Sequence, residues 1–403
     1  MTDPRRTLLH AYRAALAAVD GRTRVRDFLA ARTPERRRVV AIGKAAAAMT
    51  LGALDTGGVE SALVITKHGH DAPALRGRVT VMEAGHPLPD EASLAAGEAL
   101  FEFIRSAPAE QPFLFLLSGG ASALVEALPE GVTLADLVRV NTHLLGAGLD
   151  IAVMNQVRKR LSRIKQGRLA RALAGRPTLC LLISDVPGDD PSVIGSGPLV
   201  PDPHAHLPLP PVPADISALL ADTEPPAPDD PCFHTIETHV IASNRDARAA
   251  AARAASEAGI SVIAHDDLLT GDVAEVARHV TDTLLASGPA LHVWGGEPTV
   301  RLPPAPGRGG RCQHLALLIA ARIAGRDDIS VLAAGTDGSD GPGEDAGALV
   351  DGHTVERGED EGYRLVEVIA RADAGSFLEA SGDLITTGPT GTNVMDLVFG
   401  LKV

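Results

Sequence analysis

The sequence predicts an α/β fold in which the chain forms two units with mainly parallel sheets. Short, continuous apolar runs of strand length alternate with helical patterns, as in parallel sheets covered by helices on both faces. The same alternation returns in the C-terminal half, without an internal sequence repeat. A proline-rich stretch separates the two halves. These three observations together carry the prediction.

Strands and helices alternate along both halves of the chain. In the N-terminal half, apolar runs predict strands at 39–42, 62–66, 79–82, 113–117 and 178–184, with helices at 45–51, 90–105, 134–145 and 150–163. In the C-terminal half, the patterns predict strands at 240–242, 260–264, 291–294 and 330–334, with helices at 245–258, 273–286 and 311–323.

The proline-rich stretch places the boundary between the two units. Residues 198–231 hold 11 of the chain's 29 prolines. Proline neither continues a helix nor donates to a strand ladder, so we expect a mostly extended linker or surface loop with one short helical turn at 215–221. The predicted domains are 1–232, which includes this linker, and 233–403.

The acidic, aromatic-poor composition weighs against a nucleic-acid partner. Of 403 residues, 37 are basic and 51 acidic, which gives a formal charge of −14, and aromatics make up 3%. Proteins that bind nucleic acids normally present a basic face and stack bases on aromatic rings. Of the 37 basic residues only five are lysines (Lys44, Lys67, Lys159, Lys165 and Lys402), so arginine carries most of the positive charge.

The termini and the cysteines favour a cytoplasmic protein. The first 18 residues have an amphipathic helical pattern interrupted by arginines, unlike a signal peptide. No run of 18 apolar residues that could span a membrane is present. The widely spaced Cys180, Cys232 and Cys312 fit no disulfide framework, which indicates a reducing compartment. The sequence leaves open whether the protein forms a homodimer.

Ligands of open α/β sheets bind at the carboxyl ends of the strands, and glycine-rich or charged loops follow five strands here. In the first loop, Gly43 and Lys44 lie between a buried strand and a helix start, where an ammonium group suits a phosphate or a carboxylate. The loop is not a P-loop, since Arg38 and Ala45 stand where that motif needs glycine and a hydroxyl. The alternative is a solvated lysine.

The second loop combines glycines with hydroxyls. Ser118, Gly119, Gly120 and Ser122 follow an apolar strand, and such a loop lets backbone amides approach an anion. Ser122 is not a nucleophile elbow, because Leu124 replaces the required glycine. A tight turn without a ligand is the alternative.

The third group pairs a polar helix with an acidic loop. Asn155 and Lys159 lie on the helix, and Asp185 and Asp189 come after the strand at 178–184. Carboxylates in this position can hold Mg²⁺ or accept a hydroxyl proton, although turn formation is the alternative for Asp189. The nearby run 194–198 contains G-x-G but lacks the remainder of the dinucleotide fingerprint.

The last two loops lie in the C-terminal half. An arginine at the start of a helix is unfavourable unless an anion meets it, so Arg311 indicates a phosphate site, and a flexible glycine loop with a solvated arginine is the alternative. Around it we place Gly296, Glu297, Gly309, Gly310 and Gln313. The fifth loop carries Asp337 and Asp340 after an apolar strand, and the run that includes Thr390 and Asn393 adds hydroxyl and amide groups.

Cations, carboxylates and glycine loops together suggest phosphoryl transfer, which is catalysed by positioning and by neutralising spread negative charge. Moreover, the chain resembles the glycerate 2-kinases of the MOFRL type over essentially its whole length. The matching stretches are 42–46, 118–122, 157–170, 184–186, 196–198, 295–297, 309–311, 336–342 and 387–393.

This resemblance implies ATP-dependent phosphorylation of D-glycerate at its 2-hydroxyl, with Mg²⁺, and two Rossmann-like domains with the active site in the cleft between them. It also implies that Lys44, Arg311 and Asp337 form the catalytic centre. Asp337 would accept the hydroxyl proton, while Lys44 and Arg311 would stabilise the transferring group. The glycine loops would hold the phosphates and the substrate carboxylate.

The chain departs from the family pattern at two places. Cys312 and His314 replace the usual Asn and Glu after Arg311, and Gln166 replaces the first glycine of a Gly-Gly pair. Two other functions stay open at this point. One is an NAD(P)H-dependent hydroxypyruvate reductase, a label often given to this family, and the other is a non-catalytic sensor of sugar acids or nucleotides.

Overall fold

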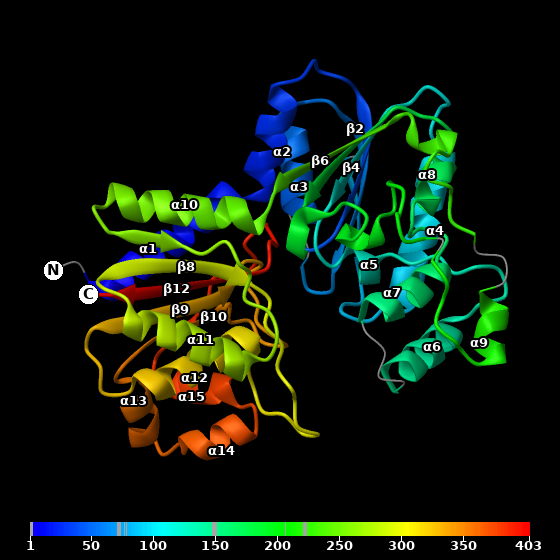
Figure 1. Cartoon of the computed structure of the whole chain (residues 1–403). Coiled ribbons are helices and arrows are strands. Elements are labelled where there is room, and N and C mark those ends of the chain that lie inside the picture. The colour runs from blue at the N-terminus through cyan, green and yellow to red at the C-terminus, as the bar shows by residue number, and fades with distance from the viewer. Residues whose placement is uncertain are drawn as a thin grey trace. The chain divides into compact units, whose positions relative to one another are not determined.

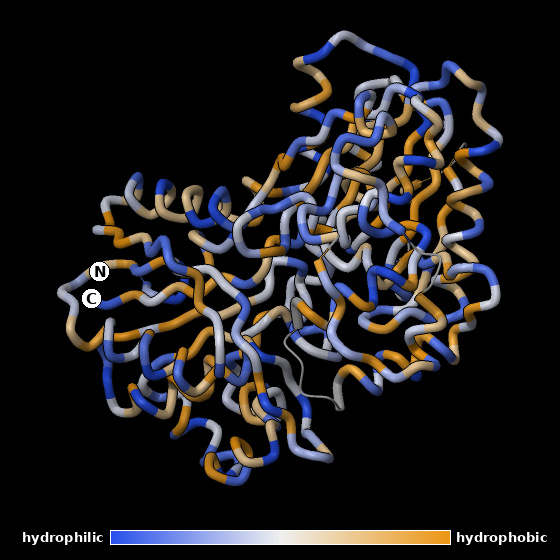
Figure 2. The backbone as a smooth tube through the Cα atoms, turned by 45° about the vertical axis from the view of Figure 1, so that its right-hand side comes forward, coloured by the Kyte–Doolittle hydropathy of each residue, from blue (hydrophilic) through white to orange (hydrophobic). Residues whose placement is uncertain are grey.

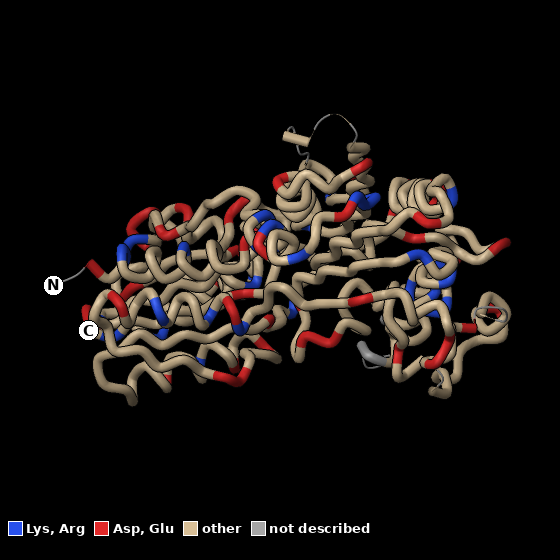
Figure 3. The backbone as a smooth tube through the Cα atoms, turned by 90° about the horizontal axis from the view of Figure 1, so that it is seen from above, with Lys and Arg blue, Asp and Glu red and all other residues tan. Residues whose placement is uncertain are grey.

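Two units divide the chain in the computed structural model, which describes residues 3–70, 74, 75, 77, 79–146, 151–205, 207–220 and 224–403. One unit comprises residues 21–241, and the other combines residues 1–20 with 242–403 (Figure 1). We call them the 21–241 unit and the split unit. Acidic and basic residues are interspersed along both units (Figure 3). No helix of the described residues is long and apolar enough to cross a bilayer.

A six-stranded sheet organises the 21–241 unit in the order β3-β2-β1-β4-β5-β6, with parallel pairings from β3 through β5. This is the order of doubly wound sheets, in which the strand order reverses between β1 and β4. The strands are β1 Arg37–Ile42, β2 Val59–Lys67, β3 Val79–Ala84, β4 Phe113–Leu117, β5 Thr178–Ile183 and β6 Ile236–Ala242.

Helices cover both faces of this sheet, α2 and α3 on one and α4, α5 and α8 on the other (Figure 1). The helices are α2 Gly21–Ala30, α3 Ala46–Asp55, α4 Glu91–Arg105, α5 Ala121–Leu124, α6 Leu134–Gly146, α7 Ile151–Arg160, α8 Arg168–Ala172 and α9 Ala214–Leu219, with short 3₁₀ turns at η1 Pro187–Asp189, η2 Ile194–Ser196 and η3 Pro231–Phe233. The predicted helix start at Asp150 lies outside the described residues.

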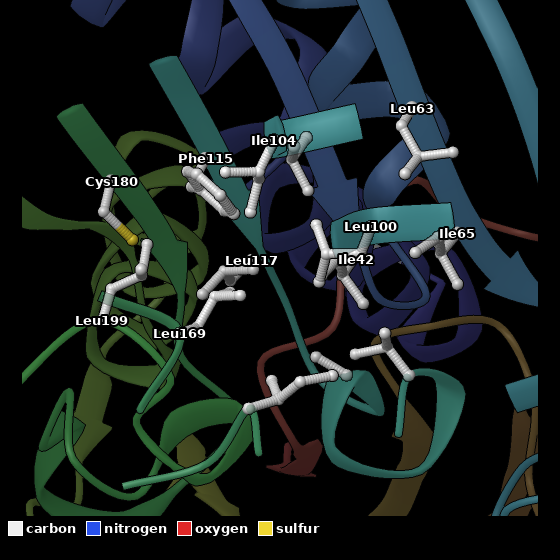
Figure 4. Packing of buried hydrophobic residues seen from close by; sticks show 14 of the residues in the cluster. Ile42, Leu63, Ile65, Leu100, Ile104, Phe115, Leu117, Leu169, Cys180 and Leu199 are labelled. Carbon is white, nitrogen blue, oxygen red and sulfur yellow. The ribbon is translucent and has the colours of Figure 1, made fainter. Parts of the chain in front are cut away.

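Alternate strand positions build the core beneath α4. Ile42, Phe115 and Leu117 share one face of the sheet and pack with Leu100 and Ile104 of α4 (Figure 4). Successive side chains of a strand point to opposite faces, so every second residue enters this cluster. Hydrophobic stretches accordingly recur along the strands in Figure 2.

The split unit holds a second six-stranded sheet, ordered β11-β10-β9-β12-β8-β7. Its strands are β7 Val262–Ala264, β8 Ala290–Gly296, β9 Ile329–Gly335, β10 Gly347–Asp351, β11 Leu384–Ile385 and β12 Asp396–Lys402. The predicted parallel pairing is found in the first sheet, whereas this second sheet is mixed. Strands β7, β8, β9 and β11 point the same way, but β10 and β12 run opposite and make every pairing except β7–β8 antiparallel.

Helices α1 and α10 cover one face of the second sheet, and α11, α12 and α15 cover the other (Figure 1). The helices of this unit are α1 Pro4–Ala18, α10 Asn244–Glu257, α11 Val273–Ala286, α12 Arg311–Ile323, α13 Thr354–Asp360, α14 Leu365–Ala370 and α15 Ala374–Ala380. Aspartates begin two elements as caps, Asp3 at α1 and Asp272 at α11, where their carboxylates accept backbone N–H groups.

The division differs from the predicted boundary at residue 232 in two respects. Helix α1 belongs to the split unit, where the buried Tyr12 hydroxyl donates to the Gly335 carbonyl at 2.7 Å and its ring packs against Phe399. Strand β6, which lies after residue 232, extends the first sheet. Met1 and Thr2 of the predicted N-terminal helix lie outside the described residues.

The proline-rich stretch is also more than a linker. Ile216 of α9 is buried against Val140 of α6 and Val157 of α7, and Leu209 and Val212 pack on the same cluster. The stretch therefore belongs to the 21–241 unit and covers α6 and α7. The end of its predicted helical turn, Ala221, lies outside the described residues.

Candidate active site

The first two sequence motifs meet where the strand order of the first sheet reverses. The amide of Ser118 donates to the Ile42 carbonyl at 3.0 Å, and the amide of Lys44 donates to the Gly119 carbonyl at 2.9 Å. The Ser118 hydroxyl accepts the amide of Ala45 at 3.0 Å. These bonds tie the ends of β1 and β4 together, at the place where doubly wound sheets bind ligands.

Two glycines of these loops are required by space as well as by conformation. A Cβ on Gly43, whose φ is +130°, would lie 2.2 Å from the Ser118 hydroxyl oxygen. A Cβ on Gly120, whose φ is +88°, would lie 3.1 Å from the His86 ring and 3.5 Å from the Lys44 side chain. The Lys44 and His86 side chains therefore lie against a bare backbone at Gly120.

Beside these loops lies a cavity of about 230 Å³ within the 21–241 unit. The predicted residues Gly120, Ser122, Asn155 and Lys159 all line it. The polar side chains that join them are His86, Glu126, Asn141, Arg158, Lys165 and Ser196. The Ser122 and Ser196 hydroxyls lie 2.8 Å apart and share a hydrogen bond.

Two buried ion pairs support the cavity. The Lys165 ammonium donates to Glu126 at 2.7 Å, and the Lys159 ammonium donates to Asp202 at 2.8 Å and to the Ser192 carbonyl at 3.2 Å. The Asp202 pKa is lowered, because Lys159 and other donors outweigh the cost of burial. The predicted ligand Lys159 thus has a carboxylate partner of its own.

The predicted metal residues stand after β5. Asp185 and Asp189 are both half-buried, and Asp189 ends the turn η1 with φ at +55°. Among the described residues, no group of three or more His, Cys, Asp or Glu could hold a metal ion. Mg²⁺ carried by a nucleotide needs only one or two protein carboxylates, so this donor set fits such an ion.

Arg311, in the split unit, is held by two carboxylates. Its Nε and Nη2 donate to Asp396 at 2.6 and 3.0 Å, and its Nη1 lies 2.6 Å from Glu297. Burial disfavours its charge, but Asp396 and Glu297 raise its pKa above the ordinary value. Two carboxylates of the protein, one of them the predicted residue Glu297, therefore pair with Arg311 at this helix start.

The N-terminus of α12 also has an acceptor of its own. The buried Asp340 carboxylate accepts the amides of Cys312 at 3.0 Å and Gln313 at 2.8 Å. Gly310 leaves room for it, since a Cβ there would lie 2.3 Å from Asp340. Burial raises the pKa of Asp340 to about 7. Asp340 is thus the cap of α12.

Asp337 lies in the loop that follows β9 and is nearly buried. Its carboxylate accepts the backbone amide and the hydroxyl of Ser339, at 3.0 and 3.1 Å. The amide of Thr390 donates to the Asp337 carbonyl at 3.4 Å, and the Thr390 hydroxyl donates to the carbonyl of Thr336. Asn393 follows in the same nearly buried segment. The structure thus brings the fifth loop and the 387–393 segment together.

The remaining predicted residues surround α12. Gly296 ends β8, and Gly309 and Gly310 lead into the helix. Gln313 is buried, and within the described residues its Oε1 has no hydrogen-bond partner. A Cβ on Gly309 would lie 3.1 Å from that oxygen. Gln313 therefore holds a buried acceptor that makes no hydrogen bond among the described residues.

The structure gathers the predicted residues into two groups, one in each unit, and adds residues that sequence analysis missed. Asp396 is one of them, and its carboxylate pairs with Arg311. The sequence feature that could have identified Asp396 is its position directly before the apolar residues of β12. His86, Asn141 and Ser196 carried no local signal, because their place in the cavity depends on long-range packing. Arg158 lay inside a matched stretch but was given no role.

The structure shows the surroundings of the three residues that depart from the family pattern, Cys312, His314 and Gln166. Cys312 is buried and burial raises the pKa of its thiol, while burial lowers the pKa of His314. Gln166 adopts φ of +55°, a conformation that favours glycine, and its side chain donates to Asp202 at 3.2 Å. The substituted residues therefore pack inside the protein.

Comparisons with known proteins place the chain in a family. Residues 7–207 match a domain described as a domain of unknown function, DUF4147, and residues 290–396 match the MOFRL family. The chain belongs to the MOFRL-type family of glycerate 2-kinases and putative hydroxypyruvate reductases.

Individual relatives span nearly the full chain. A D-glycerate 2-kinase of Thermotoga maritima is 33% identical over 94% of each chain, and a putative hydroxypyruvate reductase of Agrobacterium vitis is 36% identical over 98% of this chain and 93% of its own. The crystal structure of a glycerate kinase from Thermotoga maritima matches 99% of each chain with a TM-score of 0.85 and 30% identity. The predicted α/β fold is thereby confirmed.

Proposed function

We propose that this chain transfers the terminal phosphoryl group of ATP to the 2-hydroxyl of D-glycerate, giving 2-phosphoglycerate and ADP. The observation that carries the proposal is the meeting of Gly43, Lys44 and the Ser118–Gly120 loop where the first sheet reverses its strand order. The names of the glycerate kinase relatives support the reaction.

The proposed chemistry depends on positioning and charge. Lys44 would stabilise the negative charge that spreads over the transferring group, an electrostatic contribution that is often the largest in catalysis. We propose Arg311 for the same task and Asp337 as acceptor of the hydroxyl proton. Its neighbour Ser339 holds the Asp337 carboxylate in one orientation through two hydrogen bonds.

Mg²⁺ would neutralise phosphate charge, with Asp185 and Asp189 as the proposed ligands. Their place after β5 puts both carboxylates in a loop that follows a strand of the same sheet as β1 and β4. The other predicted binding residues, from the glycine loops of both units, stay proposed contacts to nucleotide or substrate.

A second candidate is reduction of hydroxypyruvate by NAD(P)H. The name of the Agrobacterium vitis relative and the doubly wound strand order favour it, since that order also occurs in dinucleotide-binding proteins. The absence of the G-x-G-x-x-G fingerprint from the sequence weighs against it.

One assay separates these functions. Purified protein is given ATP, Mg²⁺ and D-glycerate and monitored for ADP, and in parallel it is given hydroxypyruvate with NADH. We expect ADP release without NADH oxidation. NADH oxidation without ADP release would overturn the kinase proposal, and ligand binding without either activity would favour a sensor.

The role of Lys44 has a matched control in the same unit. Lys44→Met should lower kcat by about a hundredfold or more, because it removes a charge placed at the reacting group. Lys67→Met changes the lysine that ends β2 and should leave the rate nearly unchanged. Equal rates for the two variants would remove Lys44 from the catalytic centre.

A further inference from the structure

Three cationic side chains line the 230 Å³ cavity of the 21–241 unit, and their pairing differs. Lys159 and Lys165 each bond a carboxylate, Asp202 and Glu126 respectively. Arg158 has no carboxylate within ion-pair distance anywhere in the described part of the chain. The positive charge of the cavity wall is therefore compensated everywhere except at Arg158.

The Arg158 guanidinium is nevertheless held in place. Its Nε donates to the Asn141 side-chain oxygen at 2.7 Å and its Nη1 to that of Asn155 at 3.4 Å. Among the described residues, Nη2 has no partner. Two neutral amides thus orient a half-buried cation without neutralising it, and burial lowers its pKa. A partly desolvated cation of this kind is stabilised when an anion arrives.

The rest of the cavity suits a small polyol acid. Ser122 and Ser196 offer a pair of hydroxyls that share a hydrogen bond and can exchange it for bonds to a ligand hydroxyl. The volume lies below the range of about 300–1,000 Å³ that is usual for drug-sized ligands, which favours a ligand smaller than a nucleotide. A three-carbon acid is such a ligand.

We propose that this cavity is the subsite for the hydroxy acid and that Arg158 binds its carboxylate, with Asn141 and Asn155 as positioning residues. The inference rests on the proposed function, and it assigns the acid substrate, rather than ATP, to this cavity. Gly120 links this acid subsite to the proposed phosphoryl transfer at Lys44, because Gly120 lines the cavity and lies against the Lys44 side chain.

Calorimetric titration of D-glycerate without ATP tests the subsite directly. Arg158→Gln should weaken binding on the order of 10- to 100-fold, the effect of losing a hydrogen bond to a charged group. Arg158→Lys should recover only part of the affinity, since it keeps the charge but not the planar fork. Arg139→Gln removes an exposed arginine of α6 and should bind as the wild type does.

Two further measurements show which anionic group Arg158 binds. D-glyceramide, in which the carboxylate is an amide, should bind the wild type weakly. Its affinities for the wild type and for Arg158→Gln should be equal. In steady-state kinetics, the variant should raise KM for D-glycerate and leave KM for ATP unchanged. A raised KM for ATP alone would show that Arg158 binds a nucleotide phosphate and would overturn the inference.

The outcomes separate this inference from the proposed function. Undiminished D-glycerate binding by Arg158→Gln, with kinase activity present in the wild type, overturns the subsite and leaves the kinase intact. Arg158-dependent binding without ADP release supports the subsite and overturns the kinase. If Arg158→Gln fails to fold, the preference of the wild type for D-glycerate over D-glyceramide decides, and equal affinities overturn the inference.

Discussion

Replacing Gly43 by alanine should damage the junction between β1 and β4 more than the conformation of the residue alone would suggest. The added methyl group would lie 2.2 Å from the Ser118 hydroxyl oxygen and 2.6 Å from its carbonyl oxygen. Neither atom can move freely, because the hydroxyl accepts the Ala45 amide and the carbonyl belongs to the loop that follows β4. We therefore expect a shift of the backbone at Lys44.

The magnitude has two parts. Forcing a methyl group into a packed site costs typically about 1–3 kcal/mol, and a positive φ costs a non-glycine residue roughly 1–2 kcal/mol. Gly43→Ala should therefore destabilise the folded state by about 2–5 kcal/mol. Gly57→Ala is the control: its φ is +77°, but nothing lies within 4 Å of the added Cβ, so only the conformational cost applies.

Urea unfolding followed by circular dichroism measures both variants against the wild type, and ADP release measures their activity. Displacing Lys44 by about 1 Å should lower the rate by roughly a hundredfold, whereas Gly57→Ala should keep it. Equal losses of stability in the two variants would show that the contact with Ser118 carries no energy, and the reasoning about this junction would fail.

Three further predictions concern the buried charges and thiols. Burial raises the Asp340 pKa to about 7, above its unfolded value, so its contribution to stability is full at low pH and is lost as the pH rises through 7. Asp340→Asn should therefore gain stability relative to the wild type as the pH rises from about 4 to about 7 in urea titrations, and a constant difference would contradict this. Burial also raises the pKa of the thiols of Cys180 and Cys312, so a disulfide reagent should label these two quickly only in denaturant, and fast labelling of both in native protein would refute it. Lys165→Met leaves the Glu126 carboxylate buried without its cation and should cost about 3–5 kcal/mol in unfolding free energy, much of which a second change, Glu126→Gln, should restore.

The sequence predicted those helices and turns whose residue pattern is contained in a single segment. The helix expected at 311–323 is confirmed as Arg311–Ile323, because its apolar spacing and the glycines before it are contained in the segment itself. The glycine turns after β1 and β4 were also visible, and the sheet places them side by side as expected for strand ends at a reversal of strand order.

Long-range partners were not visible. A phosphate was expected at Arg311, and nothing in the sequence indicated that Asp396, 85 positions away on a strand that inserts between β8 and β9, pairs with its guanidinium. The proline-rich stretch was expected to separate domains, whereas its Ile216 is buried against α6 and α7. In each case the deciding contact joins residues that are distant in sequence, which no local pattern encodes.

The position of the new phosphate tests the central claim most directly. Phosphorus NMR of the product from ATP, Mg²⁺ and D-glycerate distinguishes the two hydroxyls, because a phosphate on the 2-oxygen couples to one carbon-bound proton and a phosphate on the 3-oxygen couples to two. We expect a doublet from 2-phosphoglycerate. A triplet would show transfer to the other hydroxyl, and no phosphorylated product would contradict the kinase proposal itself.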